Sequence, residues 1–323
     1  MQDIRKIFIS EDNYSQIMDR DVVPFLDSRK ESGFLEVNPG TEIYYENFYA
    51  ESPIADLLVI HGFTEAIPKY YELIYYFLKS GFNVYFPEMR GHGRSTREVE
   101  DKLLTHVDKF EDYYGDIEKF ADRFLCSENG LPKLLYCHSM GGAVGIWLME
   151  EHPALFKKAI LSSPMVAPQR KGFPLWMSKA ICGGFCRAGK GKAMFFNSAK
   201  YSLKRGFEHA KCTSRARYEY YEKRRRENDI FSNAAPTYRW VYESLIQTAR
   251  ILKKDRAAAI ETEIYLLQAD KESMVIPRSQ FRLAKELKKC TVEKIPGTEH
   301  EIFRSSDDVL EKTMEKMMNF FVK

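Results

Sequence analysis

The sequence has no long uninterrupted run of apolar residues. None approaches the roughly 20 residues that a membrane-spanning helix requires, and residues 1–12 alternate apolar and charged side chains, unlike the apolar centre of a secretory signal. The six cysteines, at positions 126, 137, 182, 186, 212 and 290, show no disulfide or zinc-ligand spacing. We therefore expect reduced thiols, no metal, no cofactor and a cytoplasmic location, with peripheral contact at the inner face of the membrane as an alternative.

Charge is distributed unevenly along the chain. The 323 residues are 44% hydrophobic and 29% charged, which is typical of a globular protein, and their net charge is only +3. Between Gln169 and Lys254, however, 20 Lys and Arg residues stand against 6 Asp and Glu, while the remainder is acidic. This segment, which includes the run Lys223–Arg226, indicates either an anionic partner such as an anionic membrane or a solvated helix face. No recognisable nucleic-acid module is present, so we expect no nucleic-acid partner.

Short apolar segments alternate with longer amphipathic ones along most of the chain. This alternation predicts an α/β fold with a mostly parallel central sheet flanked by helices. Two segments around Asn38-Pro39-Gly40 predict an opening antiparallel hairpin. The predicted strands are 33–37, 42–48, 57–60, 83–86, 133–137, 159–161, 264–268 and 292–295. The predicted helices are 70–79, 113–124, 141–149, 278–287 and 309–322.

The alternation stops between residues 164 and 258, where no convincing strand is found. We predict that 164–258 is a helical cap inserted into a core made of 1–163 and 259–323. The segment contains several large apolar residues that would either cover an acyl chain or form the core of the cap itself. These residues are Phe173, Leu175, Trp176, Phe185, Phe195 and Phe196.

A possible nucleophile follows the strand that ends at Cys137. In Cys137-His138-Ser139-Met140-Gly141, a buried strand leads through a serine into a buried helix. This arrangement is typical of the Gly-x-Ser-x-Gly turn that exposes a nucleophilic hydroxyl. Cys137 replaces the first glycine of that pattern, and we expect local distortion or a slightly shifted helix rather than loss of the turn.

Two earlier loops offer supporting residues. His61-Gly62-Phe63 follows the strand 57–60, and the backbone N–H groups of Phe63 and Met140 are the candidates for an oxyanion hole, which needs two aligned donors. His61 itself is interpreted as a structural hydrogen-bonding residue. The loop from Glu88 to Ser95 is also given a structural role, with Arg90 pinning neighbouring loops.

The general base should follow the last strand. His300 fits this position. In folds with this type of serine turn the catalytic residues occur along the chain in the order serine, acid, histidine, and the other histidines precede the acid candidates. The acid should follow the strand 264–268, where both Asp270 and Glu272 are available to accept a hydrogen bond from the imidazole. Local chemistry alone slightly favours Asp270.

These motifs together resemble the monoacylglycerol lipase and bacterial lysophospholipase branch of the α/β-hydrolases. The residues that carry the resemblance are 61–63, 90–95, 138–142, 162–164 and 300–301, with 235–244 closer to the lysophospholipases. The resemblance aligns Glu272 with the usual aspartate of the branch, and it implies Glu272 as the acid with Asp270 in reserve. It also implies a lipid ester substrate such as a lysophospholipid or a monoacylglycerol.

Serine ester hydrolysis is therefore the predicted activity, by a Ser139–His300–acid triad through an acyl-enzyme. The alternative is a carboxylesterase acting on small soluble esters. A non-catalytic binding member of the fold is the third hypothesis, because a fold alone proves no activity.

Overall fold

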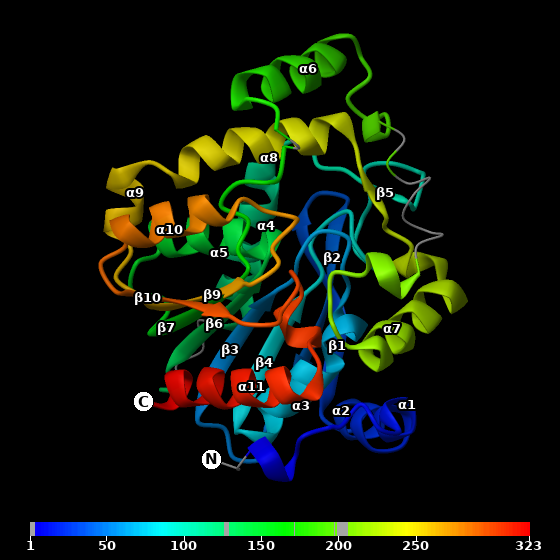
Figure 1. The fold of residues 1–323 in the computed structure, drawn as a ribbon, viewed down its shortest axis with the longest axis vertical. Coiled ribbons are helices and arrows are strands. Elements are labelled where there is room, and N and C mark those ends of the chain that lie inside the picture. The colour runs from blue at the N-terminus through cyan, green and yellow to red at the C-terminus, as the bar shows by residue number, and fades with distance from the viewer. Residues whose placement is uncertain (1–3, 126–128, 171, 197, 199–205) are drawn as a thin grey trace.

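The computed structural model describes residues 4–125, 129–170, 172–196, 198 and 206–323. Its centre is an eight-stranded sheet in the order β1-β2-β4-β3-β6-β7-β9-β10 (Figure 1). The five cysteines among the described residues are free thiols, and Cys126 lies outside them. Within the described ranges, no helix combines the length and the apolarity that spanning a membrane demands.

The sheet is parallel except at one edge. β1 and β2 form the predicted antiparallel hairpin and β2 is antiparallel to β4, whereas all further neighbours are parallel. β3 and β4 are buried on both faces, as expected for strands covered by helices on each side. The strands are β1 Lys30–Asn38, β2 Thr41–Phe48, β3 Ala55–Ile60, β4 Phe82–Pro87, β6 Lys133–His138, β7 Lys158–Ser162, β9 Glu263–Ala269 and β10 Cys290–Ile295.

Helices cover both faces of the sheet, and each face has its own apolar core. The α11 side chains Leu310, Met314, Met317 and Phe321 recur at helical spacing and are all buried. The face of the sheet that α11 covers carries α1 Tyr14–Ile17, α2 Val23–Asp27, α3 Tyr71–Lys79 and α11 Asp307–Val322. On the other face lie α4 Phe110–Phe124, α5 Met140–Glu151, α9 Lys254–Ala259 and α10 Pro277–Glu286 (Figure 1).

The segment between β7 and β9 is largely helical where the structure describes it. It contains α6 Leu175–Arg187, α7 Arg215–Glu227 and α8 Tyr238–Ile251, while α9 crosses the predicted boundary at residue 258. The expectation of no strand is wrong in one place, because the two-residue strand β8 Ala235–Pro236 pairs with β5 Leu104–Thr105. A strand this short leaves no periodic signal in a sequence. In Figure 1, α6 and α8 lie at the top of the molecule.

Candidate active site

The predicted site residues lie together at the carboxyl edge of the sheet. Phe63 follows β3, Ser139 follows β6, Glu272 follows β9 and His300 follows β10. These strands are parallel, so the loops at their carboxyl ends project from the same edge. Residues that are far apart in the chain therefore meet there.

Ser139 sits on a strained turn between β6 and α5. Its backbone angles, φ 51° and ψ −116°, are unusual for a residue with a side chain. The turn brings α5 against β3, and a Cβ on Gly141 would lie only 2.2 Å from the Ile60 carbonyl oxygen. The glycine at that position therefore permits the close approach that the turn requires.

Cys137 is accommodated at the position where the motif usually has glycine. The side chain is fully buried, and it points under α5 at Gly145. A Cβ added to Gly145 would lie 2.4 Å from Cys137 Sγ, well inside van der Waals contact. Because Gly145 has no side chain, the thiol fits and the turn is retained.

Ser139, His300 and Glu272 form a continuous hydrogen-bonded series. His300 Nε2 lies 2.8 Å from Ser139 Oγ, and His300 Nδ1 lies 2.7 Å from Glu272 Oε2. The Glu272 side chain is completely buried, and its Oε1 accepts hydrogen bonds from the N–H groups of Met274 and Val275. Burial raises the pKa of Glu272, but these bonds and that from His300 outweigh it, so the pKa lies below its ordinary value. The carboxylate is thus held ionised against the imidazole.

Asp270 is not part of this series. Its carboxylate pairs with Lys294 at 2.6 Å and accepts a hydrogen bond from Gly297 N–H. The bond from Lys294 lowers the pKa of Asp270. Of the two acids that the sequence offered, the structure brings Glu272 to His300.

The two candidate oxyanion donors are the N–H groups of Met140, directly after the serine, and of Phe63, in the loop after β3. Met140 is the first residue of α5, so its N–H has no acceptor within the helix. Phe63 lies in the loop after β3, and its ring packs at 4.2 Å against Trp240 of α8. The insertion therefore contacts the loop that carries the second candidate donor.

The residues that were given structural roles make structural contacts. His61 Nδ1 lies 2.7 Å from the Gly62 carbonyl oxygen, and its Nε2 accepts a hydrogen bond from Met89 N–H. Arg90 forms two hydrogen bonds of 2.6 Å with the buried Asp116. Both side chains fix the loop that follows β4.

Sequence reasoning missed a buried ionic chain beside His300. It runs from Glu65 through Lys69 and Glu301 to Arg304, with ion pairs of 2.6–2.7 Å. Glu65 and Lys69 are four residues apart and Glu301 directly follows His300, so spacing and adjacency were the available signals.

One group of potential metal ligands exists among the described residues. Ligand atoms of Glu98, His106 and Asp108 lie within 4.8 Å of one another. Glu98 is already paired with Arg90 at 3.1 Å, and His106 Nδ1 lies 2.8 Å from the Thr237 hydroxyl. The Nε2 of His106 lies 3.1 Å from Asp108 Oδ1, so the three side chains also contact one another.

A mostly parallel sheet covered by helices, with a serine at the strand-to-helix turn, defines this chain as an α/β-hydrolase. The Hydrolase_4 family, described as serine aminopeptidase S33, matches residues 51–307. The chain belongs to this family.

Relatives with assigned names agree with this class. Lysophospholipase L2 of Escherichia coli K12 is 27% identical over 316 residues, which is 92% of this chain and 88% of the relative. Human monoglyceride lipase is 32% identical over 115 residues, 36% of each chain.

Solved structures show the same fold. A soluble variant of Saccharomyces cerevisiae monoglyceride lipase has a TM-score of 0.72 at 16% identity, covering 90% of this chain and 94% of that one. A carboxyl esterase of Bacillus coagulans has a TM-score of 0.72 at 18% identity, covering 91% and 98%.

Proposed function

We propose that this protein is a serine hydrolase that cleaves carboxylic esters of single-chain lipids, either lysophospholipids or monoacylglycerols. The observation that carries the proposal is the hydrogen-bonded series Ser139–His300–Glu272 at the carboxyl edge of the sheet. The lipid substrate is supported by the near full-length similarity to lysophospholipase L2 and by the monoglyceride lipase relatives.

In the proposed reaction, His300 is the general base. Glu272 accepts a hydrogen bond from Nδ1–H and so keeps Nε2 free to take the Ser139 proton. The serine oxygen attacks the ester carbonyl, and the N–H groups of Met140 and Phe63 stabilise the resulting oxyanion. His300 then protonates the leaving alcohol and later activates water, which releases the fatty acid.

Residues 164–258 form the proposed cap over this site. Trp240 packs against Phe63, and the Lys211 carbonyl oxygen accepts a hydrogen bond from Glu301 N–H, next to His300. Phe185 stacks on Tyr238 at 3.9 Å inside the cap segment. Aromatic residues of the cap are therefore divided between internal packing, as at Phe185, and exposed positions, as at Trp176.

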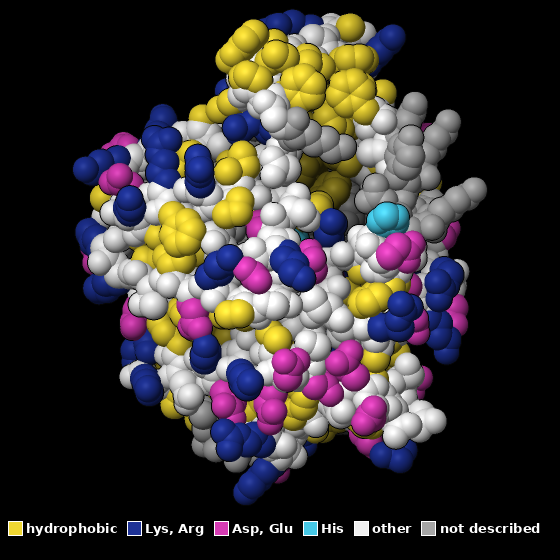
Figure 2. All heavy atoms as spheres, viewed as in Figure 1, with side chains coloured by type: hydrophobic (Ala, Val, Ile, Leu, Met, Phe, Trp, Pro, Cys, Tyr) yellow, Lys and Arg dark blue, Asp and Glu magenta, His cyan; other side chains and the backbone are white. Residues whose placement is uncertain are grey.

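The cap also supports peripheral contact with an anionic membrane. Phe173 and Trp176 are 52% and 70% exposed at the start of α6, and Arg187 and Lys190 are exposed at and just beyond its end. Figure 2 shows apolar side chains gathered over α6 with basic ones beside them. Exposed aromatic rings flanked by cations are suited to an interface of anionic lipid.

The basic run of α7 is only partly available for such contact. Arg225 donates hydrogen bonds to the carbonyl oxygens of Phe231 and Asn233, and Arg224 bonds the Tyr220 hydroxyl. Lys223 and Arg226 are exposed. The run therefore divides between internal hydrogen bonds and a solvated face.

The substrate proposal is tested by hydrolysis of a panel of lysophospholipids, monoacylglycerols and short-chain soluble esters, with Ser139→Ala as the blank. Ser139-dependent release of long-chain fatty acid is expected. Turnover of short esters alone would favour the small-ester carboxylesterase.

The membrane proposal is tested by co-sedimentation with anionic and neutral vesicles, comparing wild type with Trp176→Ala. We expect binding that requires anionic lipid and weakens in the variant. Equal binding to both vesicles would contradict it.

A further inference from the structure

Glu65 is a buried carboxylate behind the loop that carries the Phe63 donor. It is 3% exposed, and it lies three residues after Gly62. Its Oε2 accepts a hydrogen bond of 2.6 Å from Gly62 N–H and another from the Tyr70 hydroxyl. Its Oε1 accepts one of 2.6 Å from Lys69 Nζ. The carboxylate thus binds the peptide group between His61 and Gly62, one peptide before the group that carries the Phe63 N–H.

The loop is built around this carboxylate. A Cβ on Gly62 would lie 2.7 Å from Glu65 Oε2 and 3.0 Å from His138 Cδ2, so only glycine leaves room for the contact. Thr64 has a φ of 61°, a left-handed conformation that is unfavourable for a β-branched residue. A short loop with strain of this kind keeps its geometry only if its surroundings hold it.

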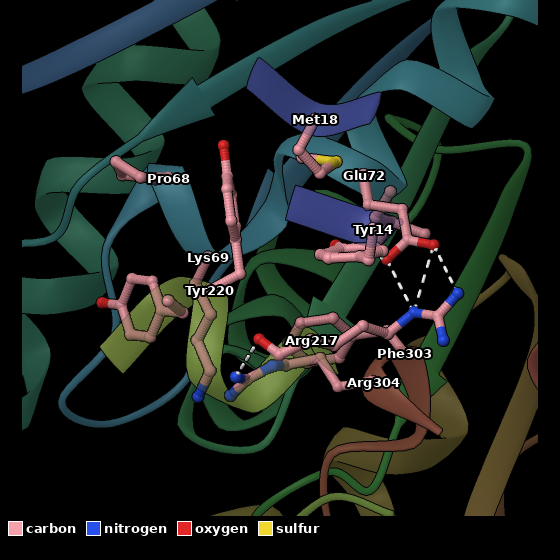
Figure 3. A pocket seen from close by; sticks show the side chains of 11 residues that line it. Tyr14, Met18, Pro68, Lys69, Glu72, Arg217, Tyr220, Phe303 and Arg304 are labelled. Carbon is pink, nitrogen blue, oxygen red and sulfur yellow. Dashed lines mark hydrogen bonds and ion pairs between the residues drawn. The ribbon is translucent and has the colours of Figure 1, made fainter. Parts of the chain in front are cut away.

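The same carboxylate is connected to the loop that carries His300. Lys69 Nζ bridges Glu65 and Glu301 with ion pairs of 2.6 and 2.7 Å, and Glu301 directly follows His300. Glu301 also binds Arg304, whose guanidinium donates a hydrogen bond of 2.7 Å to the carbonyl oxygen of Arg217 in α7. Figure 3 shows that the side chains of Lys69, Arg304 and Arg217 line one small cavity.

Positive and negative charges alternate along the series Glu65–Lys69–Glu301–Arg304, and all four side chains are largely buried. Burial raises the pKa of Glu65, but Lys69 outweighs it and lowers the pKa to about 2, so the carboxylate remains ionised. His138, which precedes Ser139, lies 3.8 Å from Glu65 Oε1, and its ring is 4.9 Å from that of His300. Glu65 therefore adjoins the oxyanion loop, the serine turn and, through Lys69, the histidine loop.

We propose that Glu65 is a positioning residue for the hydrolysis. It aims the Phe63 N–H at the oxyanion through its bond to Gly62, and it fixes the His300 loop through Lys69 and Glu301. This inference rests on the proposed function, because Phe63 N–H matters only if an oxyanion forms at Ser139. A donor displaced by about 1 Å loses on the order of 10²-fold in rate, so the effect should be on the transition state rather than on substrate binding.

The test compares Glu65→Ala and Glu65→Gln with Glu150→Gln. Glu150 is a buried carboxylate at the far end of α5 that pairs with Arg250 at 2.6 Å, so its variant controls for loss of a buried ion pair. The measurements are kcat and KM with a lysophospholipid or monoacylglycerol, and inhibition by a long-chain trifluoromethyl ketone, whose serine adduct carries an oxyanion.

For Glu65→Ala we expect kcat to fall about 10- to 100-fold, KM to change less than about 3-fold, and trifluoromethyl ketone inhibition to weaken in parallel with kcat. The kcat of Glu65→Gln should lie between those of Glu65→Ala and wild type, since the glutamine amide oxygen can still accept a hydrogen bond from Gly62 N–H. Lys69→Met, which keeps Glu65, replaces Glu65→Ala if that protein does not fold, and should also lower kcat.

A kcat loss no larger than that of Glu150→Gln, or a change confined to KM, would overturn the positioning role while leaving the proposed function intact. Absence of any Ser139-dependent turnover by wild type would overturn both.

Discussion

A double-mutant cycle at Cys137 and Gly145 tests how this chain tolerates a cysteine in the serine turn. Both residues are buried, and a Cβ on Gly145 would lie 2.4 Å from Cys137 Sγ and 3.3 Å from Leu135 Cδ2. Ordinary contacts begin near 3.4 Å, so Gly145→Ala forces the sulfur or α5 to move by about 1 Å. Overpacking of this kind costs about 1–3 kcal/mol.

A glycine-to-alanine change within a helix also brings a gain of up to about 1 kcal/mol in helix propensity, so a matched control is needed. Gly115 in α4 provides it, because an added Cβ meets nothing within 4 Å there. We expect Gly145→Ala to be less stable than Gly115→Ala by about 1–3 kcal/mol, measured by denaturant unfolding.

Removing the thiol should relieve the clash. In the Cys137→Ala background the nearest Cys137 atom to the new methyl is Cβ at 3.6 Å, an ordinary contact. The cost of Gly145→Ala should therefore shrink, with a coupling of at least about 1 kcal/mol. Additive effects of the two changes would refute the claim that Gly145 makes room for Cys137.

Three further predictions follow from the site and its supports. Glu272→Gln should lower kcat about 10³- to 10⁴-fold because the imidazole loses its orienting carboxylate. Asp270→Asn should leave kcat within about 3-fold of wild type. Steady-state kinetics of both variants would contradict the assignment if the two effects were reversed. Burial lowers the pKa of His61 to about 4, so the folded state excludes a proton that the unfolded state binds below about pH 6.5. Wild type should therefore lose stability relative to His61→Gln as the pH falls from about 6.5 to about 4. A difference in unfolding free energy between the two proteins that does not change with pH would exclude this linkage. Arg217→Met should destabilise the fold by about 3–5 kcal/mol because it leaves Glu72 buried without its 2.8 Å partner, and Glu72→Gln in the same chain should recover part of that loss in thermal unfolding.

The sequence predicted the parts of the fold that leave a periodic or positional signal. The predicted strands and the helices of the core are present with small shifts at their ends. The serine turn and the position of His300 followed from the order of strands and loops, because the carboxyl ends of parallel strands share one edge.

The N-terminal helices were missed although a signal exists. Tyr14, Met18, Val22 and Leu26 recur every four residues, and all four are buried against the core. The continuous helical stretch includes a π-helical turn at Met18–Val22 and a proline at position 24, which weaken the helical pattern.

Buried charges were the other part that the sequence could not give. Arg217 occurs in a strongly basic segment, yet its side chain is 1% exposed and contacts Glu72, 145 residues earlier in the chain. Composition describes such a residue as surface charge, and only the contact of its side chain with Glu72 in α3 shows otherwise. The choice between Asp270 and Glu272 was similarly open to local chemistry, because it depends on which side chain the β9 loop turns toward His300.

The central claim is that Ser139 is a nucleophile activated by His300, and active-site labelling tests it most directly. The protein is treated with a fluorophosphonate, and the modified peptide is located by mass spectrometry in wild type, Ser139→Ala and His300→Ala. We predict one phosphonylated residue, Ser139, with no labelling in Ser139→Ala and labelling slowed by at least about 10²-fold in His300→Ala. Modification at another residue, or equal rates in wild type and His300→Ala, would contradict the claim.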